Sequence, residues 1–451
     1  MTAVIRIVDR GIDDAIDRPG AHDVTVRSEL TPSSAIPLAY YALAHAGLAL
    51  ALLVLIADPG LPAGSFYHPR MVALVHLLTI PWLTGSILGS FYIVAPLALR
   101  VPMPAGRTDW LAFWSFALGT GGMVSHFWIG TYDGMAWSAG LVSAAVAWVA
   151  IRAWRGLPRS PAPRAVTLHV ALAFVNILAA AGLGVLIGLD RSRGFLGIPP
   201  LAATFAHAHI AAIGWVTMMV VGLSYRLIPM ILPAAMPTGR SIGASAVLIE
   251  TGLVTLVVAL LLDSQHAWVG ALLILAGLGS FVTHIRGTVA RRLPRPPALP
   301  ARDWSTWQTH VAFLWLLIAA VLGVTLSFGV GADRRLTLMW IYGVAGLVGF
   351  LAQIVTGMQG RLVPLYAWYR AFAAKGAPPE RAANALPHAP YARGIFLLWA
   401  AGVPLLAWGL PAENRLAIRL AAILLLAGVN CGGAYVVYML RQSREPARGP
   451  R

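Results

Sequence analysis

Twelve long stretches of mostly apolar residues, separated by short polar loops, constrain this chain more than any other feature of its sequence. They lie at 36–57, 71–98, 110–131, 135–152, 165–189, 200–229, 241–262, 267–289, 307–330, 336–365, 390–410 and 415–440. A helix needs about 20 apolar residues to cross the hydrocarbon core of a bilayer. The chain is 58% hydrophobic and only 11% charged, whereas roughly 25% of the residues of a soluble protein are charged. The sequence therefore predicts an all-α polytopic membrane protein with about 12 transmembrane helices.

The basic residues are distributed unevenly between the two ends of these predicted helices. Of the 33 Lys and Arg residues, 26 fall in the N-terminal tail, the even-numbered loops and the C-terminal tail. The positive-inside rule then places both termini in the cytoplasm, with a bacterial-type inner membrane as the expected location. Residues 1–34 and 441–451 are predicted cytoplasmic tails. The net charge of +16 is explained by contact with the lipid bilayer, so no nucleic-acid partner is expected.

A recurring frame of residues indicates internal repeats. A histidine is followed by Trp, Gly, Tyr and Pro at offsets of 6, 13, 16 and 20 in the second and sixth stretches. The two sets are His76, Trp82, Gly89, Tyr92 and Pro96, and His209, Trp215, Gly222, Tyr225 and Pro229. The tenth stretch retains part of the frame, with Val344 in the histidine position followed by Phe350, Gly357, Gly360 and Pro364. We predict one membrane domain at 35–440, built from three four-helix repeats at about 35–155, 160–292 and 303–440.

Eight of the 12 histidines fall within the predicted spans. They are His45, His76, His126, His169, His207, His209, His284 and His310. Polar groups inside a membrane are costly to bury, so they usually have a partner or a function. With the termini inside, His76 lies about 8 Å from the outer face of the membrane, at a rise of 1.5 Å per residue along its helix. His76, His126, His207 and His209 are predicted to share this outer layer, and the other four fall in the cytoplasmic half.

The four outer histidines suggest a metal site. Neutral imidazole is a common ligand of haem iron and copper. His207 and His209 are two residues apart, so on a helix their side chains point about 200° apart. They cannot bind one ion from one face, but they can serve two centres on opposite sides of the helix. A single buried histidine is more often a hydrogen-bonded core residue, whereas this grouping favours ligation.

The segment from Phe205 through His207, His209 and Trp215 resembles the tenth helix of subunit I of the heme–copper oxidases. It is most similar to the C-type oxidases and the nitric oxide reductases. In that family the first histidine of the His-x-His motif binds the high-spin haem and the second binds the low-spin haem. The resemblance implies these roles for His207 and His209. The frame beginning at His76 resembles the family's sixth helix, whose histidine binds copper.

The segment that begins Ser125-His126 resembles the next copper-ligand region more loosely, which makes His126 a candidate copper ligand. The same frame also resembles the NnrS proteins, which are twelve-span haem and copper proteins of the nitric oxide response. The chain departs from the oxidases in three ways. It offers one histidine where they have an adjacent pair, its His-x-His motif lies in the second repeat instead of the third, and Val344 occupies a ligand position. Either the pattern is shifted by one repeat, or His76 pairs with His209 around one haem.

These observations leave three functions open. The first is a haem-binding redox protein, with one or two b-type haems and with or without copper. It would act on oxygen or nitric oxide as an oxidoreductase, with electrons from an external donor such as quinol or cytochrome c. The second is an NnrS-type protein that binds haem and copper without turnover. The third is a transporter built from repeats, with the histidines as a proton-coupled site.

Two other kinds of polar residue lie within the predicted spans. Glu250 is the one clear acidic residue in mid-membrane, and it is either a proton carrier or a hydrogen-bonded residue of a helix contact. Arg226 and Arg361 each precede a repeat proline by three residues at the cytoplasmic end, where arginine side chains are expected to reach the interface.

Overall fold

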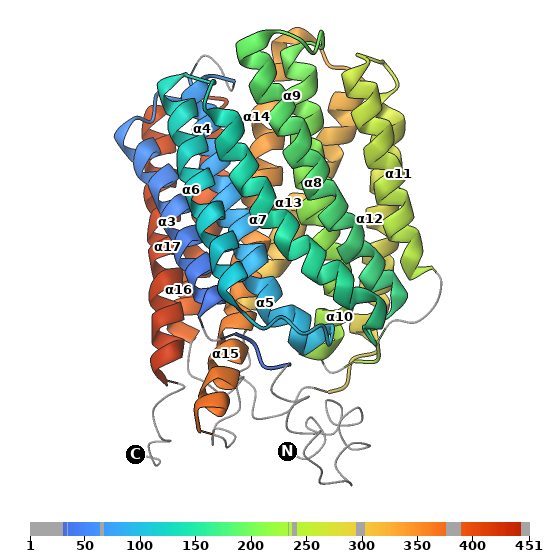
Figure 1. The fold of residues 1–451 in the computed structure, drawn as a ribbon. Coiled ribbons are helices and arrows are strands. Elements are labelled where there is room, and N and C mark those ends of the chain that lie inside the picture. The colour runs from blue at the N-terminus through green and yellow to red at the C-terminus, as the bar shows by residue number, and fades with distance from the viewer. Residues whose placement is uncertain are drawn as a thin grey trace.

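The fold was obtained as a computed structural model, which describes residues 30–33, 35–63, 67–232, 234–236, 241–294, 303–375 and 389–442. Most of the two predicted tails, residues 1–29 and 443–451, lie outside this range. The described residues form an all-helical bundle without strands, shown in Figure 1. Helical segments occupy all the predicted ranges.

Nine of these ranges each form one α-helix. They are α3 (Ile36–Ala57), α6 (Arg107–Ile129), α7 (Met135–Gly156), α8 (Arg164–Arg193), α11 (Ile242–Leu261), α12 (Ala267–Ala290), α13 (Trp304–Ser327), α16 (Ala389–Gly409) and α17 (Arg415–Gln442). The other three ranges are composite helices in which a π-helix joins two α-helices. The first is α4 (Pro69–Leu77), η2 (Leu78–Gly85) and α5 (Ser86–Ala98); the second is α9 (Pro200–His209), η4 (Ile210–Thr217) and α10 (Met218–Ile231); the third is α14 (Ala332–Gly343), η5 (Val344–Ala352) and α15 (Gln353–Lys375).

Eleven of the described helical segments are long and apolar enough to cross a membrane, so the chain is a multi-pass membrane protein. The remaining segment, α6, has a suitable length of 23 residues. It is richer in Gly, Ser and Thr than its neighbours, and it carries Asp109 in its first turn. These residues lower its apolarity, and α6 is not among the eleven candidate spans.

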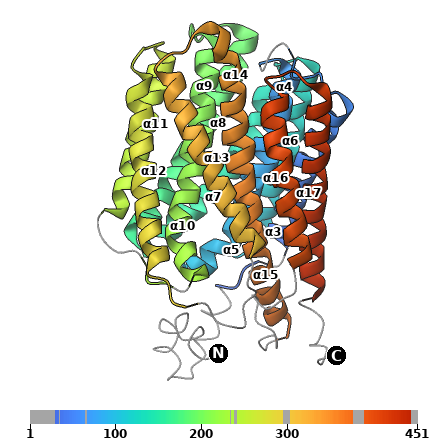
Figure 2. The same ribbon diagram turned by 180° about the vertical axis from the view of Figure 1, so that it is seen from behind.

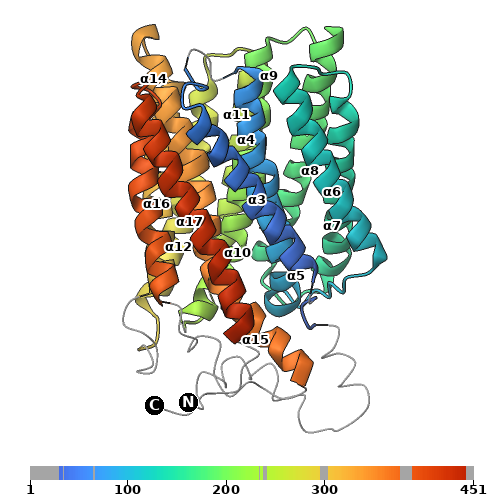
Figure 3. The ribbon, with the colours of Figure 1, turned by 90° about the vertical axis from the view of Figure 1, so that its left-hand side faces the viewer.

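The three composite helices run in the same direction through the bundle. Their first segments, α4, α9 and α14, lie toward the upper end in Figure 1, and their last segments, α5, α10 and α15, lie toward the lower end. The first and last long helices, α3 and α17, pack side by side, as can be followed from the side in Figure 3 and from behind in Figure 2.

The aromatic residues of the repeated frame form the centre of the core. Trp82, Trp215 and Tyr225 are each 1% exposed, and Tyr92 is fully buried. Phe350, at the tryptophan position of the third frame, is also buried. The frame therefore reflects a packing requirement, because each of these side chains is buried where a composite helix meets its neighbours.

The glycine of each frame permits a close approach between helices. A methyl group added at Gly89 would lie 3.0 Å from Tyr40 Cβ on α3, and one at Gly357 would lie 2.8 Å from Thr309 Oγ1 on α13. A methyl group at Gly222 would overlap the Cβ of His169 on α8. In all three places a composite helix packs against the helix that precedes it, and small residues are what permit such contacts within membranes.

This close packing predicts a stability effect. Gly222→Ala should destabilise the protein by about 1–3 kcal/mol, because the added methyl group must push α10 away from α8. The measurement is the thermal unfolding midpoint of the purified protein in detergent. Gly279→Ala on α12 is the matched control, since a methyl group there meets nothing within 4 Å. Equal midpoints for the two variants would contradict the packing role of the frame glycine.

The π-helical segments occupy corresponding positions. Each begins within two residues of the frame position held by His76, His209 or Val344. In two of them a threonine hydroxyl donates to the carbonyl five residues earlier, from Thr84 to Thr79 at 3.0 Å and from Thr217 to Ala212 at 2.9 Å. π-helical turns are rare in proteins and are often found at functional sites.

Candidate histidine site

Two of the predicted site residues, His76 and His207, lie together in the upper half of the bundle. His76 is in the last turn of α4 and His207 is in the last turn of α9. Their rings are nearly parallel, with an interplanar angle of 19° and centroids 6.4 Å apart. The two side chains come from different predicted repeats, so the pair is formed by tertiary packing.

Each of these two rings is held by a backbone carbonyl. His76 Nδ1 lies 2.8 Å from the carbonyl oxygen of Val72, one turn earlier in the same helix. His207 Nδ1 lies 2.9 Å from the carbonyl oxygen of Ala180 on α8. A carbonyl oxygen only accepts hydrogen bonds, so each Nδ1 carries the proton and donates it. In a neutral ring the Nε2 atom then keeps its lone pair, which is the usual arrangement of a histidine that binds a metal.

The surroundings of the pair are largely apolar. The ring of Phe127, on α6, packs against His76 with centroids 4.7 Å apart. Gly184, on α8, faces the ring of His207, and a methyl group at this position would lie 2.9 Å from His207 Cε1. Gly184 therefore leaves room for the imidazole of His207, and Phe127 covers the ring of His76.

His209 has different neighbours. Its Nδ1 donates to the carbonyl oxygen of Phe205 at 2.7 Å, and its Nε2 lies 3.0 Å from the hydroxyl of Tyr342 on α14. The two rings stack with centroids 6.0 Å apart. Since Nδ1 carries the proton, Nε2 accepts a hydrogen bond from Tyr342. His207 and His209 thus face different parts of the bundle, as their spacing predicts, and the histidine that meets His76 is His207 and not His209.

Tyr342 is a residue that the sequence analysis missed. It precedes Val344 by two residues, which is the offset by which His207 precedes His209. The third frame therefore has a polar side chain two residues before its histidine position, although Val344 occupies the histidine position itself. That offset is the sequence signal that could have identified Tyr342.

His126 lies near the end of α6, where its Nδ1 contacts the hydroxyl of Thr131 at 3.4 Å. Its ring packs against Gly134, at the start of α7. Within the described part of the chain, no three His, Cys, Asp or Glu side chains are grouped so that they could hold a metal ion. The role of His126 as a copper ligand remains a sequence-based expectation.

The other polar residues singled out in the sequence have partners. His169 contacts the Ser245 hydroxyl at 2.9 Å through Nε2, and His284 contacts the Ser241 hydroxyl at 3.0 Å. Glu250 accepts a hydrogen bond from the Asn176 amide at 2.8 Å, which matches the helix-contact interpretation of this acid. These contacts connect neighbouring helices.

The two frame arginines are also paired. Arg226 donates through Nε to the carbonyl oxygen of Ala98 at 2.8 Å, which joins α10 to the end of α5. Arg361 forms an ion pair with Asp303, the residue that caps the N-terminus of α13. Both arginines therefore connect helices at the lower end of the bundle. The sequence predicts that this end lies at the cytoplasmic face of the membrane.

Comparison with known proteins adds no relative. No protein-family model matches this chain, and no curated protein matches it. The functional interpretation therefore rests on the residues and their geometry.

Proposed function

We propose that this chain is a haem-binding integral membrane redox protein that acts on oxygen or nitric oxide, with twelve spans in three repeats and cytoplasmic termini. The observation that carries the proposal is the pair formed by His76 and His207. The resemblance to subunit I of the heme–copper oxidases supports it from the sequence. The corresponding positions of the three frame glycines and of the three π-helical segments support the repeats.

The donor set of this pair fits a haem iron. In each ring Nδ1 faces a backbone carbonyl, so a neutral imidazole keeps the lone pair of Nε2. The two ring centroids lie 6.4 Å apart, so both side chains would be close enough to hold one bound haem. Two neutral nitrogen ligands also suit an apolar site, because they add no charge to the membrane interior.

The chain's own residues would perform three tasks at such a site. His76 and His207 hold the haem, and the carbonyls of Val72 and Ala180 keep each Nε2 available by engaging the Nδ1 proton. Phe127 limits the access of water to one side of the pair. A bound haem would supply an iron that changes oxidation state by one electron, with electrons from an external donor such as quinol or cytochrome c. His209 is the proposed ligand of a second haem, and His126 of copper.

A haem binder without turnover, of the NnrS type, is the second candidate. The hydrogen bond from Tyr342 favours it, because this bond occupies the Nε2 of His209 and so opposes the binding of a second metal there. The two candidates share the His76 and His207 site. They differ in whether the bound gas is reduced.

An optical spectrum tests the proposal. Protein purified after expression with ample haem should show a Soret band and an α band in a reduced-minus-oxidised difference spectrum. A preparation without either band would overturn both haem candidates and favour the transporter alternative. Metal analysis and an assay of oxygen or nitric oxide consumption with an artificial electron donor then distinguish the enzyme from the binder.

A further inference from the structure

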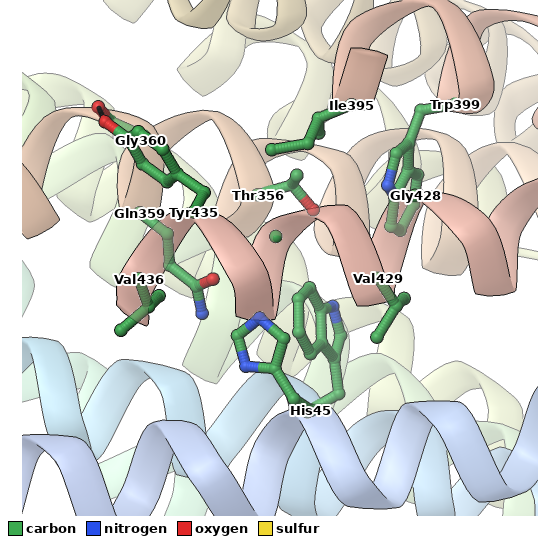
Figure 4. A pocket seen from close by; sticks show the side chains of 12 residues that line it. His45, Thr356, Gln359, Gly360, Ile395, Trp399, Gly428, Val429, Tyr435 and Val436 are labelled. Carbon is green, nitrogen blue, oxygen red and sulfur yellow. Dashed lines mark hydrogen bonds between the residues drawn. The ribbon is translucent and has the colours of Figure 1, made fainter. Parts of the chain in front are cut away.

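A second polar site lies on the other side of the bundle, between α3, η2, α15, α16 and α17. A small cavity is lined there by His45, Trp82, Gln359, Trp399 and Tyr435 and by seven other residues. Figure 4 shows the labelled side chains of His45, Gln359 and Trp399 converging on it from three different helices. No acidic, lysine or arginine side chain is among its lining residues, so the cavity suits a neutral occupant.

Two hydrogen-bond donors in the lining have no partner among the described residues. The indole N–H groups of Trp82 and Trp399 are both buried, each residue is 1% exposed, and no acceptor in the described part of the chain lies within hydrogen-bond distance of either nitrogen. The two rings stack with centroids 6.5 Å apart. An indole nitrogen can only donate, and a buried donor without an acceptor loses about 1–3 kcal/mol. An occupant of the cavity that accepts hydrogen bonds would remove this loss.

The second frame provides a comparison. Trp215 occupies the same frame position as Trp82 and is equally buried, but its indole N–H donates to the hydroxyl of Thr84 at 3.2 Å. The threonine of η2 thus satisfies the tryptophan of the second frame directly. The first repeat instead places Trp82 at a cavity, which points to an occupant there.

The same cavity also presents acceptors. His45 Nδ1 donates to the carbonyl oxygen of Tyr41 at 2.8 Å, so a neutral His45 has its lone pair on Nε2. The amide nitrogen of Gln359 donates to the hydroxyl of Ser86 at 3.1 Å, which identifies Oε1 as the acceptor atom of that side chain. Two donors and two acceptors therefore line one small space.

Two glycines of α17 leave this space open. A methyl group at Gly428 would lie 3.0 Å from Trp399 Nε1, and one at Gly432 would lie 3.3 Å from His45 Nε2. These glycines are one helical turn apart on the same face of α17, a separation of about 6 Å. The absence of side chains at these two positions therefore leaves space next to both Trp399 Nε1 and His45 Nε2.

We propose that this cavity is an internal water site, in which ordered water bridges the indole N–H groups of Trp82 and Trp399 to His45 Nε2 and Gln359 Oε1. Water accepts two hydrogen bonds and donates two, which matches the lining. The cavity has room for roughly one or two water molecules, and it offers the two to four polar partners that a buried water needs. The proposal does not depend on haem binding.

A density map of the full-length protein in lipid nanodiscs, at a resolution that shows ordered water, tests the site. Water density is expected within about 3.2 Å of Trp399 Nε1 and, from the same or a second water molecule, within about 3.2 Å of His45 Nε2. Gly428→Ala and Gly432→Ala should each remove it, because the new methyl groups occupy its place. Gly433→Ala is the matched control and should retain it, since a methyl group at that position lies 3.8 Å from His45 Cδ2.

Ultraviolet resonance Raman spectroscopy gives a second readout that does not require a glycine substitution. The difference between the spectra of the wild-type protein and Trp399→Phe isolates the indole N–H signal of Trp399. A band at the hydrogen-bonded position supports the proposal. The proposal is overturned by a band at the free position, by a cavity without density in the wild type, or by density for a molecule larger than water.

Discussion

Protein with His207 replaced by alanine is expected to lose most of the haem that the proposed function assigns to it. The imidazole of His207 faces that of His76 and is held in place by Ala180 and Gly184. Even the loss of a residue that only positions a ligand typically lowers metal affinity by about 10–100-fold, so the loss of the ligand itself should lower haem content at least tenfold. The measurement is the Soret absorbance per mole of protein, with haem quantified by extraction. His76→Ala should have the same effect, because the two rings form one site.

Two control variants make this experiment specific. His310→Ala should retain the full haem content, because His310 is an exposed residue of α13 whose ring contacts Trp307. Gly184→Ala should give an intermediate loss by pushing the ring of His207 from its place, and added imidazole should partly restore the spectrum of His207→Ala. If His209→Ala loses the haem while His207→Ala retains it, the proposed pair is not the haem site.

Removal of the carboxylate of Asp109 should produce the largest change in stability. This side chain is only 3% exposed, and it forms an ion pair with Arg152. It also accepts hydrogen bonds from the Tyr92 hydroxyl at 2.7 Å, from the Trp148 indole at 3.1 Å and from the backbone N–H of Gly106 at 2.8 Å. Asp109→Ala removes the ion-pair partner of the largely buried Arg152, whose guanidinium keeps only its hydrogen bond to the Pro104 carbonyl, and it removes the acceptor of the Tyr92 and Trp148 donors. Breaking such a buried ion pair costs about 3–5 kcal/mol.

Thermal unfolding in detergent measures the effect of Asp109→Ala. Asp333→Ala is the control, because Asp333 also lies in the first turn of a helix, α14, but is exposed. Asp109→Asn should be intermediate, since it removes the charge and retains one acceptor oxygen. A midpoint for Asp109→Ala within a degree or two of the control would show that the network contributes little.

Much of the fold follows from the sequence because the lengths of the apolar stretches are set by the membrane. The first predicted stretch, 36–57, has the same bounds as α3, and the frame glycines mark where helices touch. The number of candidate spans is eleven instead of the predicted twelve, because α6 contains too many small and polar residues to count by apolarity. Helix length alone does not show whether such a segment crosses the bilayer.

The candidate site was only partly predictable. The offset of two residues from His207 to His209 fixes their opposite directions, because successive residues of an α-helix are about 100° apart. The partner of His76 depends on the rotation of α4 relative to α9, which is determined by tertiary packing. Tyr342 could have been found from its offset of two residues before Val344, but its contact with His209 depends on tertiary packing. Asp109 was missed because Trp148 and Arg152, two of its partners, lie about 40 residues further along the chain.

The side-by-side packing of α3 and α17 has a consequence for the order of the proposed repeats. The first repeat contacts the third through this pair, and the second contacts both of the others through α7 with α8 and through α12 with α13. Three units that each contact the other two form a closed ring. Each unit of such a ring has one of the other units on either side. The His-x-His motif therefore has a neighbouring unit on either side whether it lies in the second unit, as His207 and His209 do here, or in the third.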